Sequence, residues 1–400
     1  MIKKYFCTSL ISLAAAAVLY GQSATPTPMP TPLGSVNGGW AGSGISGPGK
    51  RVVGHGDGGW RSGQGGAIYK GSDPKPEWST QFGNYFSGTA VKSGIVPPIK
   101  PLLELHLRDT VIIIGGDGNY YMTGSTGDNI WWFNDGVELW RSKDLKKWDY
   151  LGLVWSIEKD GTWEKTRWQN KNGKPIRAIW APELHYLNKN YYIAFSMPTG
   201  GGIGILKSTS GKPEGPYVNA LAENKPIASS IDPTLFQDDD GKIYFVYGNP
   251  NKIGRMKDDL SGLAEPMRDI VLESPDHDPA HHAERCMPRG SNDIGNEGAS
   301  LFKHNGKYYL GAADDYEGRY SSVVAIGDNV YGPYRRRHEA VPSGGGTNYF
   351  KDKNGNWWCA FFGNDDYLNW REKPGIVRID FAKDGRIMVA KEQPKWNLAK

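Results

Sequence analysis

A strand-turn-strand pattern occurs five times along this chain of 400 residues. Its clearest copy spans residues 231–248, where Asp232-Pro233 opens a short apolar stretch, a run of Asp and Gly follows, and an aromatic stretch returns. Short apolar runs on either side of such a turn predict a β-hairpin. The other four copies start at Asp109, Glu183, Glu297 and Thr347. Because five similar hairpins follow one another, the chain is constrained to a repeated β architecture.

The spacing of the hairpins indicates the size of the repeated unit. The aromatic residues of the returning strands are 71, 53, 64 and 49 residues apart; they are Tyr120, Tyr191, Tyr244, Tyr308 and Trp357. A four-stranded blade fits that period, and a ring of such blades protects its sheet edges. The content of 15 Trp, 21 Tyr and 53 Gly also favours β-structure. We therefore predict an all-β fold, a five-bladed β-propeller over residues 95–396.

The first 94 residues have a different composition. Lys3 and Lys4 precede an apolar run, which predicts a signal peptide over residues 1–24. Residues 25–94 are rich in Pro and then in Gly, which predicts a linker and an irregular Gly-rich N-terminal arm. We expect a secreted or periplasmic protein with no membrane association after signal cleavage. Cys286 and Cys359 would remain in an oxidising compartment, and the sequence leaves open whether they pair.

Polar residues recur at the start of the first strand of each predicted blade. They are Asp109, Glu183, Asp232 and Glu297, with Thr347 and Asn348 in the fifth copy. First strands line the axis of a propeller, so we expect the four carboxylates to meet in one pocket. Clustered carboxylates either bind a cation or divide acid and base roles between them. Glycoside hydrolysis uses the second arrangement, and the many aromatic side chains suit a sugar ligand.

Four short motifs in a fixed order carry a family resemblance. Arg108-Asp109, Trp180-Ala-Pro-Glu183, Ile231-Asp232-Pro233 and Asn296-Glu297-Gly298 together resemble glycoside hydrolase family 43 over residues 95–396. The resemblance implies a five-bladed β-propeller and an inverting β-xylosidase, α-L-arabinofuranosidase, arabinanase or exo-galactanase. It also implies that Asp109 is the general base and Glu297 the general acid. Asp232 matches the carboxylate that orients the acid and tunes its pKa.

The remaining candidate site residues are expected to bind substrate. Trp180, Trp131 and Trp132 are candidate stacking platforms, and Glu183, Thr347 and Asn348 are candidate polar contacts. Residues 158–173, with Trp163, and 274–296, with His281 and His282, exceed what blades need, and such loops commonly carry specificity. His281 and His282 are therefore assigned to substrate contact. Many family members place a metal-binding His in the fifth blade, but residues 344–348 contain none, so we expect neither a calcium ion nor another cofactor.

These observations predict a secreted glycoside hydrolase that acts on oligosaccharides from plant or algal polysaccharides. We expect it to be inverting and exo-acting, of the α-L-arabinofuranosidase or β-xylosidase type. The net charge of +4 gives no reason to expect a nucleic acid partner. Two alternatives remain open, a non-catalytic carbohydrate-binding propeller and a five-bladed glycoside phosphorylase. A phosphorylase needs a cationic phosphate cradle, and the one dense basic run, Arg335-Arg336-Arg337-His338, is interpreted as a solvated outer strand.

Overall fold

The computed structural model describes ten stretches of the chain: residues 99–126, 134–167, 169–171, 174–198, 201–248, 252–273, 294–295, 297–316, 319–363 and 373–399. The predicted signal peptide, linker and Gly-rich arm lie outside these residues. So do four candidate substrate contacts, Trp131, Trp132, His281 and His282, and the possible disulfide partner Cys286. Cys359 is buried as a free thiol.

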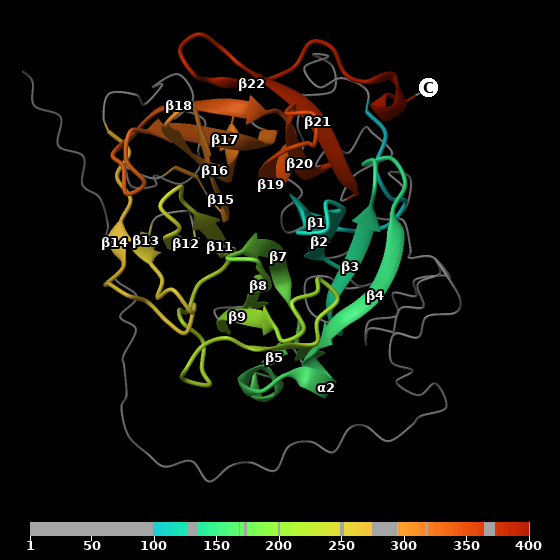
Figure 1. Cartoon of the computed structure of the whole chain (residues 1–400), viewed down its shortest axis with the longest axis vertical. Helices are drawn as coiled ribbons and strands as arrows, with labels where there is room; N and C mark the ends of the chain where they lie inside the picture. The colour runs from blue at the N-terminus through green and yellow to red at the C-terminus, as the bar shows by residue number, and fades with distance from the viewer. Residues whose placement is uncertain are drawn as a thin grey trace, which may run out of the picture. The chain divides into compact units, whose positions relative to one another are not determined.

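Five four-stranded antiparallel sheets follow one another along the chain and form a five-bladed ring (Figure 1). Blade 1 holds β1 (Arg108–Ile114), β2 (Tyr120–Ser125), β3 (Gly136–Ser142) and β4 (Asp149–Ser156). Blade 2 holds β7 (Trp180–Leu187), β8 (Asn190–Met197), β9 (Gly202–Ser208) and β10 (Tyr217–Asn219). Blade 3 holds β11 (Thr234–Gln237), β12 (Ile243–Tyr247), β13 (Lys252–Arg255) and β14 (Arg268–Asp269). The predicted all-β, five-bladed architecture is confirmed.

The last two blades complete the ring. Blade 4 holds β15 (Glu297–His304), β16 (Lys307–Tyr316), β17 (Arg319–Gly327) and β18 (Tyr334–Val341). Blade 5 holds β19 (Gly344–Lys351), β20 (Trp357–Gly363), β21 (Pro374–Phe381) and β22 (Ile387–Val389), followed by the short helix η4 (Lys395–Asn397). The five predicted hairpins are the first two strands of each blade. Their turns use left-handed residues, such as Asn188 and Lys189 in blade 2 and Asn305-Gly306 in blade 4, as tight hairpins require.

The connection between blades 1 and 2 contains the helices α2 (Ile157–Asp160) and η2 (Trp163–Thr166) and the two-stranded sheet of β5 (Gln169–Lys171) and β6 (Lys174–Ile176). Trp163 is 6% exposed and stacks on Phe195, with ring centroids 6.1 Å apart. The predicted specificity loop therefore contributes this tryptophan to the core. Among the residues that the structure describes, no helix is long and apolar enough to cross a membrane.

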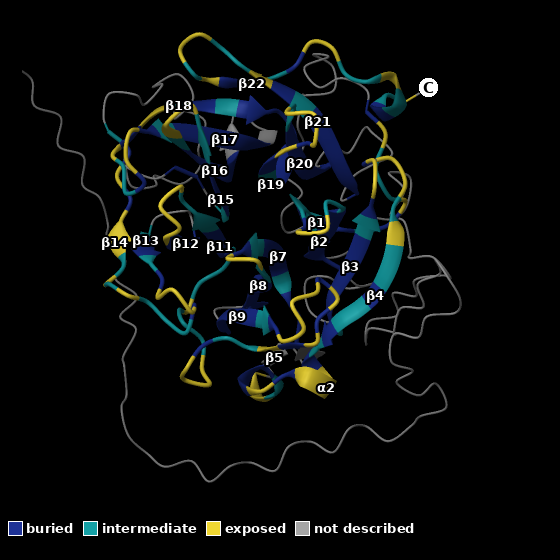
Figure 2. Cartoon of the chain, in the orientation of Figure 1, coloured by how far each residue is buried: buried dark blue, intermediate teal, exposed yellow. Residues whose placement is uncertain are grey.

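A hydrophobic cluster fills each of the five interfaces between neighbouring blades, and Figure 2 shows the buried strands that supply it. Between blades 1 and 2, for example, the fully buried Trp155 and Phe195 lie with ring centroids 5.5 Å apart. Burying one such aromatic side chain stabilises the fold by roughly 2–3 kcal/mol. Because every blade is covered on both faces, the five sheets depend on one another.

Backbone hydrogen bonds join the two ends of the propeller. Ile99 forms a bridge with Leu398, and the Leu102 N–H donates to the carbonyl oxygen of Pro374 over 2.8 Å. Within the ring, Asn348 Oδ1 accepts a 3.1 Å hydrogen bond from the backbone N–H of Ile112. Blade 5 is thus fixed against blade 1 by polar bonds as well as by apolar packing. This junction of blades 5 and 1 places the glycine-rich strand β19 next to Asp109.

Candidate active site

The first strand of every blade starts near a residue with a left-handed backbone conformation. The five residues and their φ angles are Asp109 (52°), Ala181 (44°), Asp232 (51°), Gly298 (71°) and Gly346 (48°). In β1, β7, β15 and β19 the pairing register also shifts at this point. Such a bulge bends the strand and redirects its side chains. Non-glycine residues in this conformation store strain that is commonly found at functional sites.

The bulges show that the predicted carboxylates do not occupy equivalent positions. Asp109 and Asp232 hold the left-handed position itself, whereas Glu297 precedes it by one residue and Glu183 follows it by two. Asp109, Asp232 and Glu297 line one pocket. Glu183, the fourth predicted acid, is not among the lining residues, although its charge acts on both Asp109 and Asp232.

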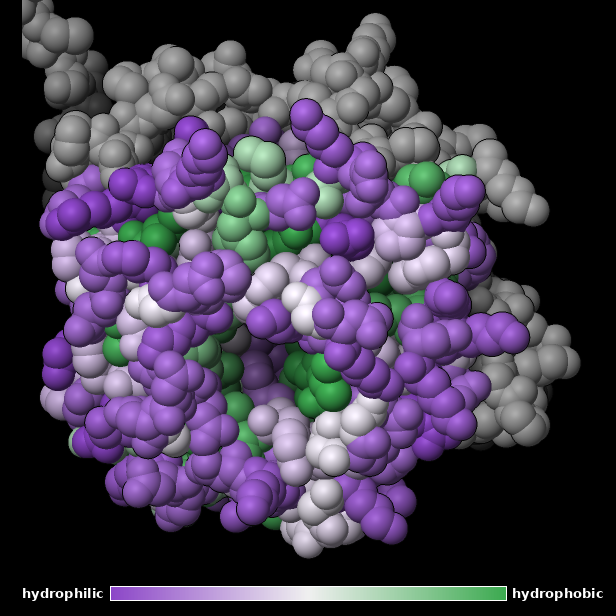
Figure 3. Space-filling model, turned by 45° about the horizontal axis from the view of Figure 1, so that its top comes forward, coloured by the Kyte–Doolittle hydropathy of each residue, from purple (hydrophilic) through white to green (hydrophobic). Residues whose placement is uncertain are grey.

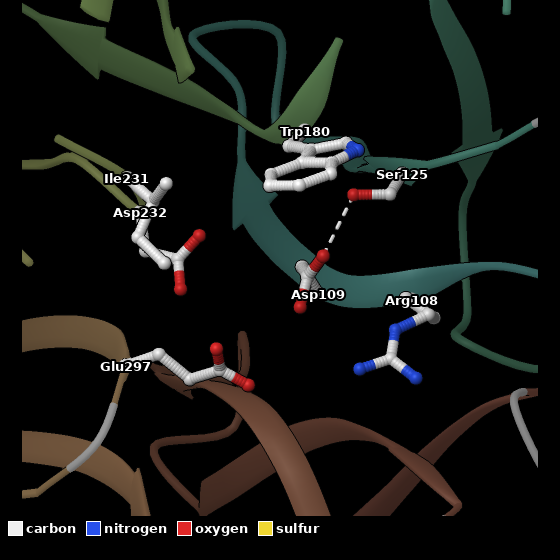
Figure 4. A pocket seen from close by; sticks show the side chains of 7 residues that line it. All are labelled: Arg108, Asp109, Ser125, Trp180, Ile231, Asp232 and Glu297. Atoms are coloured by element: carbon white, nitrogen blue, oxygen red, sulfur yellow. Dashed lines mark hydrogen bonds between the residues drawn. The ribbon is translucent and has the colours of Figure 1, made fainter. Parts of the chain in front are cut away.

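Side chains from blades 1 to 4 form one pocket, drawn in Figure 4. Its lining consists of Arg108, Asp109, Ser125, Trp180, Ile231, Asp232 and Glu297, and it encloses about 380 Å³ including its open mouth. A hollow is visible near the middle of the face shown in Figure 3. The three carboxyl groups point into the pocket of Figure 4 from different sides.

Asp109 is held at the junction of blades 1 and 2. The Ser125 hydroxyl donates a 2.6 Å hydrogen bond to Asp109 Oδ2 and accepts one of 2.8 Å from the backbone N–H of Ala181. Burial raises the pKa of Asp109 above its usual value, and the charges of Glu297 and Glu183 add to this rise. The Arg108 charge and the Ser125 hydrogen bond oppose it. The net effect is a raised pKa on an oriented carboxyl group.

Asp232 is bonded directly to the backbone beside Glu297. Its Oδ2 accepts a 2.8 Å hydrogen bond from the Gly298 N–H, and its own N–H donates to Ser196 Oγ over 3.3 Å. Burial raises the pKa of Asp232 well above its usual value, and the charges of Glu297 and Asp109 raise it further. Since neighbouring carboxylates repel one another when ionised, the pocket disfavours ionisation of all its carboxyl groups at once. Such a site can hold an acid and a base side by side.

The other predicted contacts lie in different places. Trp180 lines the pocket. Glu183 is outside the lining, with Oε2 3.2 Å from Nε2 of His185. Thr347 Oγ1 lies 3.0 Å from Ser322 Oγ, and Asn348 bonds to blade 1 as described above. Among the described residues, no group of three His, Cys, Asp or Glu side chains is arranged to hold a metal ion.

Three lining residues, Arg108, Ser125 and Ile231, were absent from the sequence-based site. Arg108 and Ile231 directly precede Asp109 and Asp232, so both stood within the motifs and could have been found there. Ser125 is different, because it is the residue paired with Arg108 at the end of β2. Only the register of that hairpin brings it to Asp109, and no sequence signal marks it.

The propeller with a carboxylate pocket on its axis defines a class of sugar-cleaving enzymes. The model of the glycosyl hydrolases family 43 matches residues 99–387, more than half of the chain. The chain therefore belongs to glycosyl hydrolase family 43, and the family predicted from the sequence motifs is confirmed.

Curated relatives include several glycosidases. A β-D-galactofuranosidase of Aspergillus niger is 30% identical over 200 residues, which cover 48% of this chain and 49% of that protein. Xylosidase/arabinosidase 43A of Humicola insolens is 26% identical over 265 residues, covering 54% and 76% respectively. The chain spans about half the length of several relatives, with 46%, 49% and 52% of three of them covered.

Solved structures agree on the fold. A family 43 enzyme from Xanthomonas citri complexed with xylotriose has a TM-score of 0.55 at 20% identity, with 74% of this chain and 96% of that one covered. An α-L-arabinofuranosidase from Clostridium thermocellum has a TM-score of 0.51 at 20% identity, with 72% and 95% covered. At this identity both likenesses establish the fold alone.

Proposed function

We propose that this chain is a secreted, inverting, exo-acting glycoside hydrolase of the α-L-arabinofuranosidase or β-xylosidase type. Its substrates are oligosaccharides derived from plant or algal polysaccharides. The observation that carries the proposal is the convergence of Asp109, Asp232 and Glu297, from three different blades, on one small pocket. The xylosidase/arabinosidase relatives support the choice of sugar.

In the proposed reaction Glu297 donates its proton to the glycosidic oxygen as the bond from that oxygen to the anomeric carbon breaks. Asp109 takes a proton from a water molecule that attacks the same carbon from the opposite face of the sugar. The configuration is therefore inverted. An inverting pair needs about 6.5–9.5 Å between its carboxyl groups to admit the water, and we expect Asp109 and Glu297 to meet this condition.

The other lining residues support these two steps. Ser125 fixes the direction of the Asp109 carboxyl group, and Asp232 fixes the backbone that carries Glu297. Trp180 and Ile231 supply apolar surface for one face of a sugar ring. We propose that the pocket takes a single terminal sugar, which corresponds to exo action. The proposed mechanism requires neither a metal ion nor an organic cofactor.

The test is a screen on aryl α-L-arabinofuranoside, β-D-xyloside and β-D-galactofuranoside, followed by natural oligosaccharides. NMR of the first product should detect the inverted anomer. Asp109→Asn should abolish hydrolysis, while Arg141→Met, on the outer part of blade 1, should leave it unchanged. A retained anomeric configuration, or full activity of Asp109→Asn, would overturn the proposed mechanism.

The two alternatives make different predictions. A carbohydrate-binding propeller would bind these sugars without turnover in any of the assays. A phosphorylase would release sugar phosphate only when inorganic phosphate is added. The structure does not favour the basic run as a phosphate cradle. The Arg337 side chain is only 5% exposed and forms an ion pair with Asp314. The basic run lies on the outer strand β18 as expected, but Arg337 and His338 are buried rather than solvated.

A further inference from the structure

Arg108 occupies an unusual place beside the candidate base. It is the residue before Asp109 and lines the same pocket. Its guanidinium carbon lies 4.1 Å from the ring centroid of Phe362, at the end of β20 in blade 5. Phe362 is fully buried, so its ring is a fixed platform. A cation over such a face is attracted to it, the more so when both are shielded from water.

The first strand of blade 5 leaves the space for this arrangement. A Cβ atom at Gly346 would overlap the Asp109 carboxyl group, and would lie 2.8 Å from Asp109 Cα and 2.9 Å from the Phe362 ring. Gly346 also has a left-handed backbone, with φ of 48°. Glycine is therefore required here for two reasons, space and backbone conformation. Blade 5 thus presents a bare backbone to Asp109 and an aromatic face to Arg108.

The charges around Asp109 explain why a cation is needed. The negative charges of Glu297 in blade 4 and Glu183 in blade 2 act on Asp109, and Asp109 and Asp232 of blade 3 act on each other. Of the described residues that line the pocket, Arg108 is the one cation. A buried carboxylate surrounded by like charges takes up a proton unless an opposite charge lies close by. A protonated Asp109 could not accept a proton from water.

We propose that Arg108, held against Phe362, is a positioning residue that keeps the Asp109 carboxylate charged and able to act as the base. This inference rests on the proposed function, in which Asp109 is that base. Phe362 holds the guanidinium from blade 5, and Gly346 leaves room for the Asp109 carboxyl group beside it. Blade 5 therefore helps to set the charge of a base that belongs to blade 1. Arg108 acts through Asp109, and its effect should appear as a change in pH dependence.

The test is the pH profile of kcat/KM on the best aryl glycoside. Arg108→Met should move the acidic limb upward by about 1 to 2 pH units, the effect expected for loss of an adjacent opposite charge, with activity largely recovered above that limb. Arg108→Lys should move the limb less, because it keeps the charge. Phe362→Leu, which does not alter the pocket lining, should move it in the same direction as Arg108→Met by releasing the guanidinium.

Controls separate this inference from the proposed function. Arg141→Met removes a blade 1 arginine that pairs with Asp149 at 3.7 Å, and it should leave the profile unchanged. If Asp109→Asn is inactive but Arg108→Met lowers kcat/KM equally at every pH, the inference is overturned and the base assignment stands. If Asp109→Asn is active, the proposed function itself fails. Should Arg108→Met not fold, as judged by circular dichroism, an unmoved limb in Phe362→Leu overturns the inference.

Discussion

The backbone N–H of Gly298 donates a 2.8 Å hydrogen bond to Oδ2 of Asp232, so blade 3 holds the strand of blade 4 at the residue next to Glu297. This bond gives Asp232 a mechanical role as well as an electrostatic one. It fixes the direction in which Glu297 leaves its strand. It also brings two carboxyl groups close together, which influences where the protons of the pocket reside.

Asp232→Ala should lower kcat by roughly 10² or more without a comparable rise in KM, because it removes an interaction that aligns the acid. Steady-state kinetics on an oligosaccharide would measure this. Asp232→Asn preserves an oxygen that can accept the Gly298 bond but removes the charge. If the two variants lose equal activity, the charge rather than the hydrogen bond carries the role of Asp232.

Glu297→Gln should reduce turnover of natural oligosaccharides by about 10²–10⁴, the usual contribution of a general acid. Aryl glycosides with good leaving groups should be affected far less, since their leaving oxygen needs little protonation. The ratio of the two losses, from kcat/KM on matched substrates, is the measurement. Equal losses on both substrates would contradict the assignment of Glu297 as the acid.

Ser125→Ala should impair both activity and stability. It removes the donor to Asp109 and the acceptor for the Ala181 N–H, and buried groups left without partners cost about 1–3 kcal/mol. We expect kcat/KM to fall about 10- to 100-fold as Asp109 loses its orientation. Ser208→Ala is the matched control, because Ser208 is equally buried but bonds to the Lys212 carbonyl oxygen. It should lose stability with no change in kcat/KM.

His338 should make the propeller less stable in acid. Its Nε2 accepts a 2.8 Å hydrogen bond from the Ile387 N–H, so Nδ1 carries the proton and bonds to the Arg336 carbonyl oxygen at 2.7 Å. The pKa of His338 is lowered from 6.5 to about 4, mainly by burial. The Arg386 and Arg337 charges act in the same direction, whereas the hydrogen bond to Arg336 and the Asp384 charge oppose them. Below pH 6.5 the unfolded chain binds a proton that the folded chain does not.

The free energy of unfolding should therefore fall between pH 6.5 and about pH 4, by at most about 3 kcal/mol from this group. Denaturant unfolding at several pH values would measure the slope. His338→Gln should be less stable than the natural chain at pH 7.5 and should show a shallower slope below pH 6.5. An unchanged slope would show that other groups cause the acid sensitivity.

The fold was predictable from the sequence because its signals are local. The turn at Asn305-Gly306 and the apolar strands beside it can be recognised without knowing their partners. Trp163 and Arg337 were misjudged for the opposite reason. Trp163 packs on the ring of Phe195, and Arg337 forms a buried ion pair with Asp314. Each partner lies more than twenty residues away in the sequence.

The site was predictable only in part. The motifs that contain Asp109, Asp232 and Glu297 stand out in the sequence, and the structure brings these residues together. The alignment of the five first strands with one another could not be predicted from the sequence, because the left-handed position is filled by Asp, Ala or Gly in different blades. No residue type marks the bend, so Glu183 was placed in the pocket. Ser125 and Phe362 were missed since only strand register and blade packing bring them to Asp109 and Arg108.

The closure of the ring has a consequence for how the enzyme would fail. Each sheet takes its four strands from one continuous stretch of the chain, so no strand that the structure describes is shared between blades 5 and 1. The ring is closed at this boundary by backbone hydrogen bonds between residues 99–102 and residues 374–398 and by side-chain packing. The Asp109 carboxyl group lies against Gly346 across this boundary, whereas Asp232 and Glu297 belong to blades 3 and 4. A change at the boundary between blades 5 and 1 therefore alters the surroundings of the base directly and those of the acid only through the other blades.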